Sequence, residues 1–187
     1  LNEANEDEIK QLEKMLVDLE KGKKTPGKGF LKIKIRQLIA DLKSGKIKSF
    51  GVSNFTANQM DMFKGKVEIL YNQINLSLTH LDHMFDGTLE YMQANNILPM
   101  AYSPLGSYFK EEKGKIKEVV DKLKNKYDCT DYQLLISWLL KHPSKVYPVV
   151  GTTKSDRIKS TLESLKIEID LIDWFELLEA SIGKRVP

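Results

Sequence analysis

From about residue 46, short apolar runs alternate with longer segments of helical periodicity, and this alternation limits the fold more than any other feature. Runs of β-branched and aliphatic residues predict four strands, at residues 47–52, 67–74, 97–102 and 146–150. Helical spacing predicts helices after Thr56 and at residues 87–96, 114–126, 130–141, 155–165 and 171–182. Strands that alternate with helices pair in parallel through right-handed crossovers. The sequence therefore predicts an α/β protein whose parallel sheet is buried on both faces.

Two architectures are compatible with four βα units. A doubly wound sheet usually carries its glycine-rich phosphate turn after the first strand. In this chain the turn of that kind, Gly151–Lys154, follows the last strand, where (β/α)8 barrels usually bind phosphate. A complete barrel needs about 250 residues, and 187 residues are too few. The pattern favours half of a (β/α)8 TIM-type barrel, with four βα units and a last helix.

The first 29 residues do not follow this alternation. Apolar residues recur at helical spacing from Ile9 to Leu19 among lysines and glutamates, which predicts an amphipathic helix over residues 1–24. Residues 23–29 are rich in glycine, proline and lysine and are typical of a linker. A short strand at residues 30–35 and a helix ending at Ser44–Gly45 are expected next. We expect an amphipathic helical arm and linker at residues 1–29 and the half-barrel at residues 30–187.

Composition argues against several kinds of partner. The net charge is only +3, and no arginine-rich patch is interleaved with aromatics, so no nucleic acid partner is expected. No apolar run approaches the roughly 18 residues that a membrane span requires, and the polar first ten residues do not resemble a signal peptide. The single Cys129 excludes an internal disulfide, and His80 and His83 lack the carboxylate pattern of a metal site. A cytoplasmic protein without a membrane or metal partner is expected.

The turn after the fourth predicted strand has the features of a phosphate site. The strand is followed by Gly151–Thr153, which combines a glycine with two hydroxyls, and a helix begins near Ser155. Free N–H groups at a helix start attract an anion. Lys154 and Arg157 lie on one face of the first turn and add positive charge there. An ordinary strand, turn and helix with a solvated basic end is the alternative, and this turn alone does not decide between the two.

Polar or aromatic side chains also follow the other three predicted strands. Ser53 and Asn54 follow the first strand, Gln73 lies in the second, and Tyr102 and Ser103 end the third. The carboxyl ends of parallel strands meet at one edge of a sheet. Amides exchange hydrogen bonds with a carboxamide, and a tyrosine ring offers a stacking surface. The pattern suits a neutral, amide-bearing ring rather than a metal, although helix capping and core packing would also explain these residues individually.

Taken in order, these segments resemble the aldo-keto reductases. The matching segments are Gly51–Phe55, Asn72–Gln73, Ala101–Gly106, Gly151–Lys154 and the closing Trp174–Ser181. The similarity is greatest to the bacterial branch with a Gly-Thr-Thr-Lys phosphate loop, and it runs from about Leu38 to Pro187. The resemblance implies an oxidoreductase with a (β/α)8 barrel that binds NADPH and transfers hydride to an aldehyde or ketone. Residues 30–187 would be its cofactor-binding C-terminal half.

The resemblance also implies roles for individual residues. The polar residues after the first two strands would hold the nicotinamide carboxamide, and the tyrosine would stack on the nicotinamide ring. The turn after the third strand would line the pyrophosphate path, and the basic turn would grip the adenosine 2′-phosphate. Two cations at that turn favour NADP over NAD. The cofactor-binding residues implied in this way are Ser53, Asn54, Gln73, Tyr102, Ser103, Leu105, Gly106, Gly151, Thr152, Thr153, Lys154, Ser155 and Arg157.

The family's catalytic aspartate, tyrosine, lysine and histidine have no counterpart in the matching residues. Hydride arrival builds negative charge on the carbonyl oxygen, which must be protonated or stabilised at once. No tyrosine precedes Tyr71 and no histidine precedes His80, so residues 1–37 cannot supply the set and no catalytic residue is assigned. Either a longer polypeptide supplies the first half, or a true half-barrel pairs with itself or with a partner. A non-catalytic NADPH-binding or partner-binding half-barrel, and a module for another phosphorylated metabolite, are the alternatives.

Overall fold

The computed structural model of the chain describes residues 10, 36–38, 40–65, 68–110 and 114–186. The chain divides into two compact units, Leu1–Val52 with Asn58–Leu70, and Ser53–Ala57 with Tyr71–Pro187. The arm and linker expected at residues 1–29, with their boundary, and the strand expected at residues 30–35 fall outside the described residues, apart from Lys10.

The first unit contains a helical segment at residues 36–38 and 40–43, which ends in a turn at Ser44–Gly45 as predicted. Gly45 adopts a left-handed φ of 70° there. The strand expected at residues 47–52 is mostly wrong, because only Val52 and Ser53 form a strand. The N–H groups of Lys46 and Ile47 donate to the carbonyl of Asp41, so these two residues belong to the turn that follows the helix.

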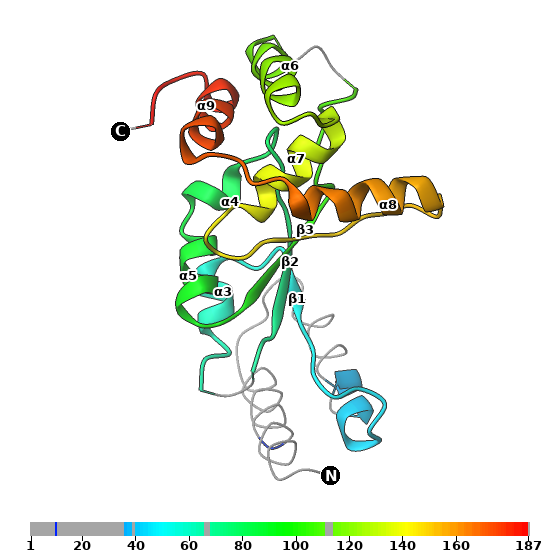
Figure 1. Cartoon of the computed structure of the whole chain (residues 1–187). Coiled ribbons are helices and arrows are strands. Elements are labelled where there is room, and N and C mark those ends of the chain that lie inside the picture. Colours follow the sequence, from blue (N-terminus) through cyan, green and yellow to red (C-terminus); the bar gives the residue numbers. More distant parts are fainter. Residues whose placement is uncertain (1–9, 11–35, 39, 66–67, 111–113, 187) are drawn as a thin grey trace. The chain divides into compact units, whose positions relative to one another are not determined.

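The sheet has four strands in the order β1-β2-β3-β4, which is also their order along the chain. The strands are β1 Val52–Ser53, β2 Tyr71–Asn75, β3 Leu98–Tyr102 and β4 Tyr147–Pro148. β3 pairs in parallel with β2, with Gln73 opposite Met100, and also with β4. Figure 1 shows β2 and β3 as neighbours. Sequential, parallel neighbours are what a wall of a (β/α)8 barrel requires, so the predicted parallel α/β topology is confirmed.

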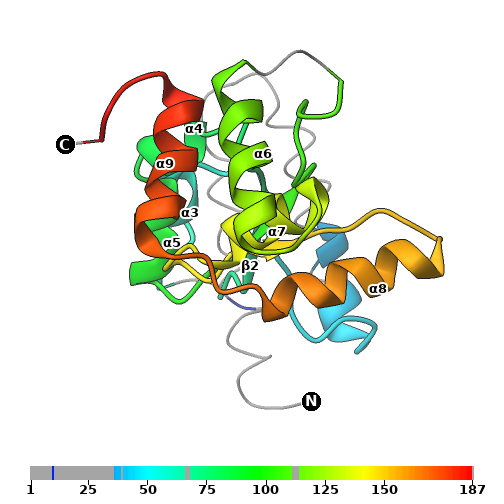
Figure 2. The same ribbon diagram turned by 45° about the horizontal axis from the view of Figure 1, so that its top comes forward.

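Helices follow the strands much as the periodicity predicts. They are α3 Ala57–Asp61, α4 Asp82–Phe85, α5 Thr88–Ala94, α6 Lys115–Lys126, α7 Asp131–Leu140, α8 Ser155–Glu163 and α9 Leu171–Ile182, with a short 3₁₀ helix η1 at Ser164–Lys166. The short helix α4 was not expected. Figure 2 shows α6 and α9, which contact each other, side by side, while α8 extends away from them.

α7 is the central helix of the second unit. Every residue from Gln133 to Leu139 is buried. Its first turn is closed by a capping box, in which Thr130 accepts from the Gln133 N–H and the Gln133 side chain accepts from the Thr130 N–H. At its other end Trp138 stacks on Trp174 of α9, with ring centroids 5.3 Å apart. A helix buried all round fixes the position of whatever is attached to its ends.

The two faces of the sheet differ in burial. Asn72, Ile74 and Ala101 are fully buried, and the Asn72 side chain reaches Met92 of α5. On the opposite face Tyr71 and Tyr147 remain 39% and 54% exposed. Within the second unit, no described element fully covers this second face, so the expected burial of both faces is not met there. We call it the open face.

Candidate cofactor site

Hydrogen bonds join the end of β1 to the middle of β2. The Ser53 Oγ donates to the Gln73 carbonyl oxygen at 3.1 Å, and the Asn54 N–H donates to the same oxygen at 2.9 Å. Asn54 holds a left-handed φ of 54°, which asparagine tolerates better than most residues. Within the described part of the chain, the side-chain amides of Asn54 and Gln73 make no hydrogen bond, so both can accept and donate to a ligand.

Asn72 supports this pair, and sequence reasoning did not assign it a role. Its amide nitrogen donates to the Phe55 carbonyl at 2.8 Å, and its amide oxygen accepts from the Phe55 N–H at 3.3 Å. A fully buried side chain with these bonds fixes the loop that carries Ser53 and Asn54. The available signal was an asparagine at a strand position that was expected to be buried.

The third and fourth strand ends form a cleft. It has a volume of about 210 Å³ and is lined by Ser103–Gly106 and Val149–Thr152, together with Tyr132 and Arg157. Five of the expected cofactor residues therefore meet with Arg157 around one cavity: Ser103, Leu105, Gly106, Gly151 and Thr152. A Cβ atom on Gly151 would meet nothing within 4 Å, so this position leaves room for a bound group.

The turn after β3 needs a glycine for the protein's own packing. Gly106 has a φ of 54°, and a Cβ atom there would lie 2.0 Å from Thr79 Oγ1 and 2.4 Å from Ser77 Oγ. The neighbouring Ser107 N–H donates to Thr79 Oγ1 at 3.0 Å. Thr79 and Ser77 thus pack against the backbone of this turn. They can approach Gly106 this closely only because glycine has no side chain.

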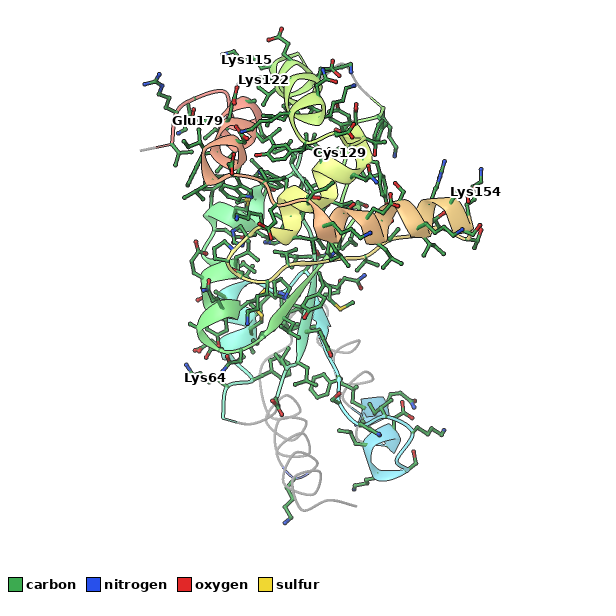
Figure 3. All side chains as sticks on the ribbon, viewed as in Figure 1. Lys64, Lys115, Lys122, Cys129, Lys154 and Glu179 are labelled. Carbon is green, nitrogen blue, oxygen red and sulfur yellow. The ribbon has the colours of Figure 1, made fainter. Side chains whose placement is uncertain are left out.

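The basic turn is more open than the cleft. The Lys154 N–H donates to Thr152 Oγ1 at 3.2 Å, and α8 begins at the next residue. Figure 3 shows Lys154 at the outer end of α8. Thr153, Lys154 and Ser155 do not line the cleft, whereas Arg157 does. Neither cation pairs with a carboxylate among the described residues, although Asp156 adds a negative charge to the same helical turn.

Tyr102 lies apart from both groups. It is half-buried, pairs in register with Asn75, and shares a face of the sheet with Gln73 and Met100. It is therefore on the open face near the strand ends and does not line the cleft.

A second cavity adjoins the cleft. Its volume is about 510 Å³, and its walls are Leu105, Phe109, Thr130, Tyr132, Arg157 and Ser160. Leu105, Tyr132 and Arg157 line both cavities. Sequence reasoning missed Tyr132, because the first turn of α7 meets α8 only in three dimensions.

The titratable side chains that line the two cavities are Tyr132 and Arg157. No carboxylate, histidine or thiol lines them, and no group of three metal-ligating side chains exists among the described residues. The nearby Tyr108 donates to Asp131 Oδ2 at 3.0 Å, and burial together with this carboxylate raises the pKa of the phenol well above its usual range. The polar groups and the Arg157 guanidinium around these cavities are of the kinds that bind phosphate.

Most of the chain matches the profile of one protein family. The profile described as the aldo/keto reductase family matches residues 32–181. The chain belongs to the aldo-keto reductase family.

Individual relatives agree with this assignment. This family member is 35% identical over 155 residues to 6-dehydroglucose reductase of Agrobacterium fabrum, a match that covers 81% of the chain and 52% of that protein. It is 34% identical over 122 residues to the NADPH-dependent alpha-keto amide reductase of Saccharomyces cerevisiae, covering 62% of the chain and 38% of that protein. The crystal structure of the thermostable aldo-keto reductase Tm1743 with the inhibitor epalrestat superimposes with a TM-score of 0.70 at 23% identity, over 78% of the chain and 53% of that structure.

The fold therefore covers part of an aldo-keto reductase (β/α)8 barrel, as predicted. The chain spans about half the length of the 6-dehydroglucose reductase and of the Tm1743 structure. Among the described helices, none combines the length and the apolarity needed to cross a bilayer.

Proposed function

We propose that residues 30–187 are the cofactor-binding half of an NADPH-dependent aldo-keto reductase that reduces a small aldehyde or ketone. The observation that carries the proposal is the cleft in which the ends of β3 and β4 meet Arg157. Asn54 and Gln73, whose amides are free as far as the structure describes the chain, are neighbours, because the Asn54 N–H donates to the Gln73 carbonyl. The yeast relative, whose name states NADPH dependence, supports the choice of cofactor.

The described residues fit such a cofactor. Asn54 and Gln73, whose amides have no described partner, would receive the carboxamide, and Tyr102 would lie against the ring. The turn Ser103–Gly106 and the phosphate loop would hold the pyrophosphate, while Lys154 and Arg157 would bind the 2′-phosphate. The bound cofactor supplies the hydride. The chain's own residues orient the cofactor. The single cysteine, Cys129, supports a reducing compartment such as the cytoplasm.

A fluorescence titration with NADPH and NADH tests the cofactor assignment. We expect tighter binding of NADPH, and loss of that preference in the double variant Lys154→Ala/Arg157→Ala, because each cation contributes a charge-assisted bond to the 2′-phosphate. Removing both should weaken NADPH binding by about ten-fold or more and leave NADH nearly unchanged.

A matched control removes the same charge elsewhere on the same segment. Lys159 and Lys166 are exposed residues of α8 and η1 that line neither cavity. Lys159→Ala/Lys166→Ala should retain the preference for NADPH. Equal affinity of the unmodified chain for both nucleotides would refute the assignment.

The open face favours a second candidate function, binding of a partner that completes the barrel. We propose that the catalytic acid comes from such a partner, either a preceding half of the same polypeptide or another chain. Steady-state assays with a reactive aldehyde check this. Turnover by residues 1–187 alone would contradict it, and turnover only after a complementary half-barrel is added would support it.

A further inference from the structure

Three hydrogen-bonding groups connect α7 to Arg157. The Tyr132 hydroxyl lies 2.6 Å from Thr161 Oγ1, and Thr161 Oγ1 donates to the Arg157 carbonyl oxygen at 2.8 Å. Because the Thr161 proton is used on that carbonyl, the Tyr132 hydroxyl must donate to Thr161. Each hydroxyl therefore donates to the next group, first from Tyr132 of α7 to Thr161 and then from Thr161 to Arg157.

α8 depends on such polar contacts. The helix has no buried residue, and its apolar Ile158 and Leu162 are 46% and 58% exposed. Burial of apolar surface, the usual force that fixes a helix, is therefore small here. Besides Tyr132, Gln133 reaches α8 by donating to the Ser160 carbonyl at 3.4 Å and to Glu163 Oε2 at 3.1 Å.

The other end of this connection is rigid. α7 is buried from Gln133 onward, and its first turn is closed by the capping box with Thr130. Tyr132 therefore extends from a fixed helix, while Arg157 belongs to an exposed one. Both line the cleft and the adjoining cavity.

We propose that Tyr132 is a positioning residue: through Thr161 it holds the first turn of α8 so that Arg157 faces the cleft, and it thereby sets the preference for a 2′-phosphorylated nucleotide. This proposal rests on the proposed function. In this role the Tyr132 hydroxyl acts on Thr161 and, through it, on Arg157, so its removal should affect NADPH far more than NADH.

The test is a parallel titration of NADPH and NADH on the unmodified chain and on Tyr132→Phe. The phenyl ring stays, so the cavity walls are kept and only the bond to Thr161 is lost. We expect NADPH to bind about five-fold more weakly, the loss that corresponds to one net hydrogen bond, with NADH changed by less than about two-fold. Thr161→Val should reproduce the effect, Thr161→Ser should retain the parent's preference, and the pair Tyr132→Phe/Thr161→Val should be no worse than either single variant.

Tyr147→Phe is the matched control, since it removes a tyrosine hydroxyl that makes no hydrogen bond among the described residues and lines neither cavity. Amide hydrogen exchange without any nucleotide gives a second readout, in which Tyr132→Phe should speed exchange at residues 157–163 and Tyr147→Phe should not. An equal loss of NADPH and NADH affinity, or unchanged affinity for both, overturns the positioning role while leaving the cofactor assignment intact. If the unmodified chain does not prefer NADPH, both the positioning role and the cofactor assignment are refuted.

Discussion

Asp173 shows how a single carboxylate can hold two helices of the second unit together. It is only 6% exposed, it accepts from Lys126 Nζ at 2.5 Å, and it accepts a short bond from the Tyr127 hydroxyl. Burial alone would raise its pKa, but the hydrogen bonds from Lys126 and Tyr127 outweigh it and hold the pKa of Asp173 below its usual value. The charged form is therefore favoured in the folded state.

Replacing Asp173 with asparagine should destabilise the protein in a pH-dependent way. A carboxylate whose folded pKa is depressed stabilises the fold above its unfolded pKa of about 3.9, and this contribution is lost as the pH falls through the folded pKa. We expect Asp173→Asn to cost about 2 kcal/mol at pH 7 and almost nothing well below pH 3.9, as measured by urea denaturation at several pH values.

Asp170 provides the control for that experiment. It also accepts from Lys126, at 2.9 Å, but its side chain is 66% exposed. Asp170→Asn should cost less than about 0.5 kcal/mol at either pH. A cost for Asp173→Asn that does not change with pH would show that shape, rather than charge, matters at that position.

Residues at strand ends could be proposed from sequence because the chain order of a parallel sheet places them at one edge. The bond from Ser53 to Gln73, and the cleft that Gly106 and Gly151 both line, follow from that rule. The supports of the site did not follow from it. Thr79 contacts Gly106, which is 27 residues away, and Tyr132 contacts Thr161, which is 29 residues away. No local sequence pattern encodes such contacts.

At the scale of elements, α7 and α9 are joined by a reciprocal pair of tryptophans. The Trp138 indole N–H donates to the Trp174 carbonyl at 3.2 Å, and the Trp174 indole N–H donates to the Trp138 carbonyl at 2.9 Å. The rings are nearly parallel, with an angle of 10° between them. Large stacked aromatics with both polar groups satisfied make a strong helix contact.

Trp174→Phe keeps an aromatic ring but loses one of these hydrogen bonds and part of the stacked area. We expect a loss of about 2 kcal/mol in the free energy of unfolding, followed by far-UV circular dichroism in urea. Ile172→Ala, on the same helix at 82% exposure, should cost less than about 0.5 kcal/mol. Similar costs for both variants would mean that the tryptophan pair is not special.

Helices were predicted more accurately than strands. α6, α7 and α9 begin and end within a residue or so of the expected bounds, because the repeat of apolar residues and the Thr130 capping signal are local. β1 and β4 are only two residues long, although their apolar runs predicted five or six. Strand length depends on how much of a neighbouring strand is available to pair, and a sequence run does not contain that information.

For the chain as a whole, the barrel could be recognised only as a half. The parallel order of its strands was predictable. The open face was not, because apolar residues of the kind that normally face a barrel interior are expected to be buried. Tyr71 and Tyr147 on this face, and Leu162 and Leu165 on α8 and η1, are exposed apolar side chains in the second unit. Exposed apolar groups of this kind favour association.

We expect the chain to associate at high concentration, with a mass in sedimentation velocity that rises with concentration. Leu162→Gln/Leu165→Gln should reduce this rise without lowering stability, since both side chains are already more than half exposed. Leu162→Met/Leu165→Met, which keeps the surface apolar, should behave like the parent. A concentration-independent mass for the parent would contradict the prediction.

The tryptophan pair also determines what spectroscopy can report. Trp138 and Trp174 are the chain's only two tryptophans, and they lie in contact. Their emission on excitation near 295 nm therefore reads a single junction, the one between α7 and α9. A melting curve recorded at that wavelength would follow the separation of these two helices. It would not report an earlier unfolding of the first unit.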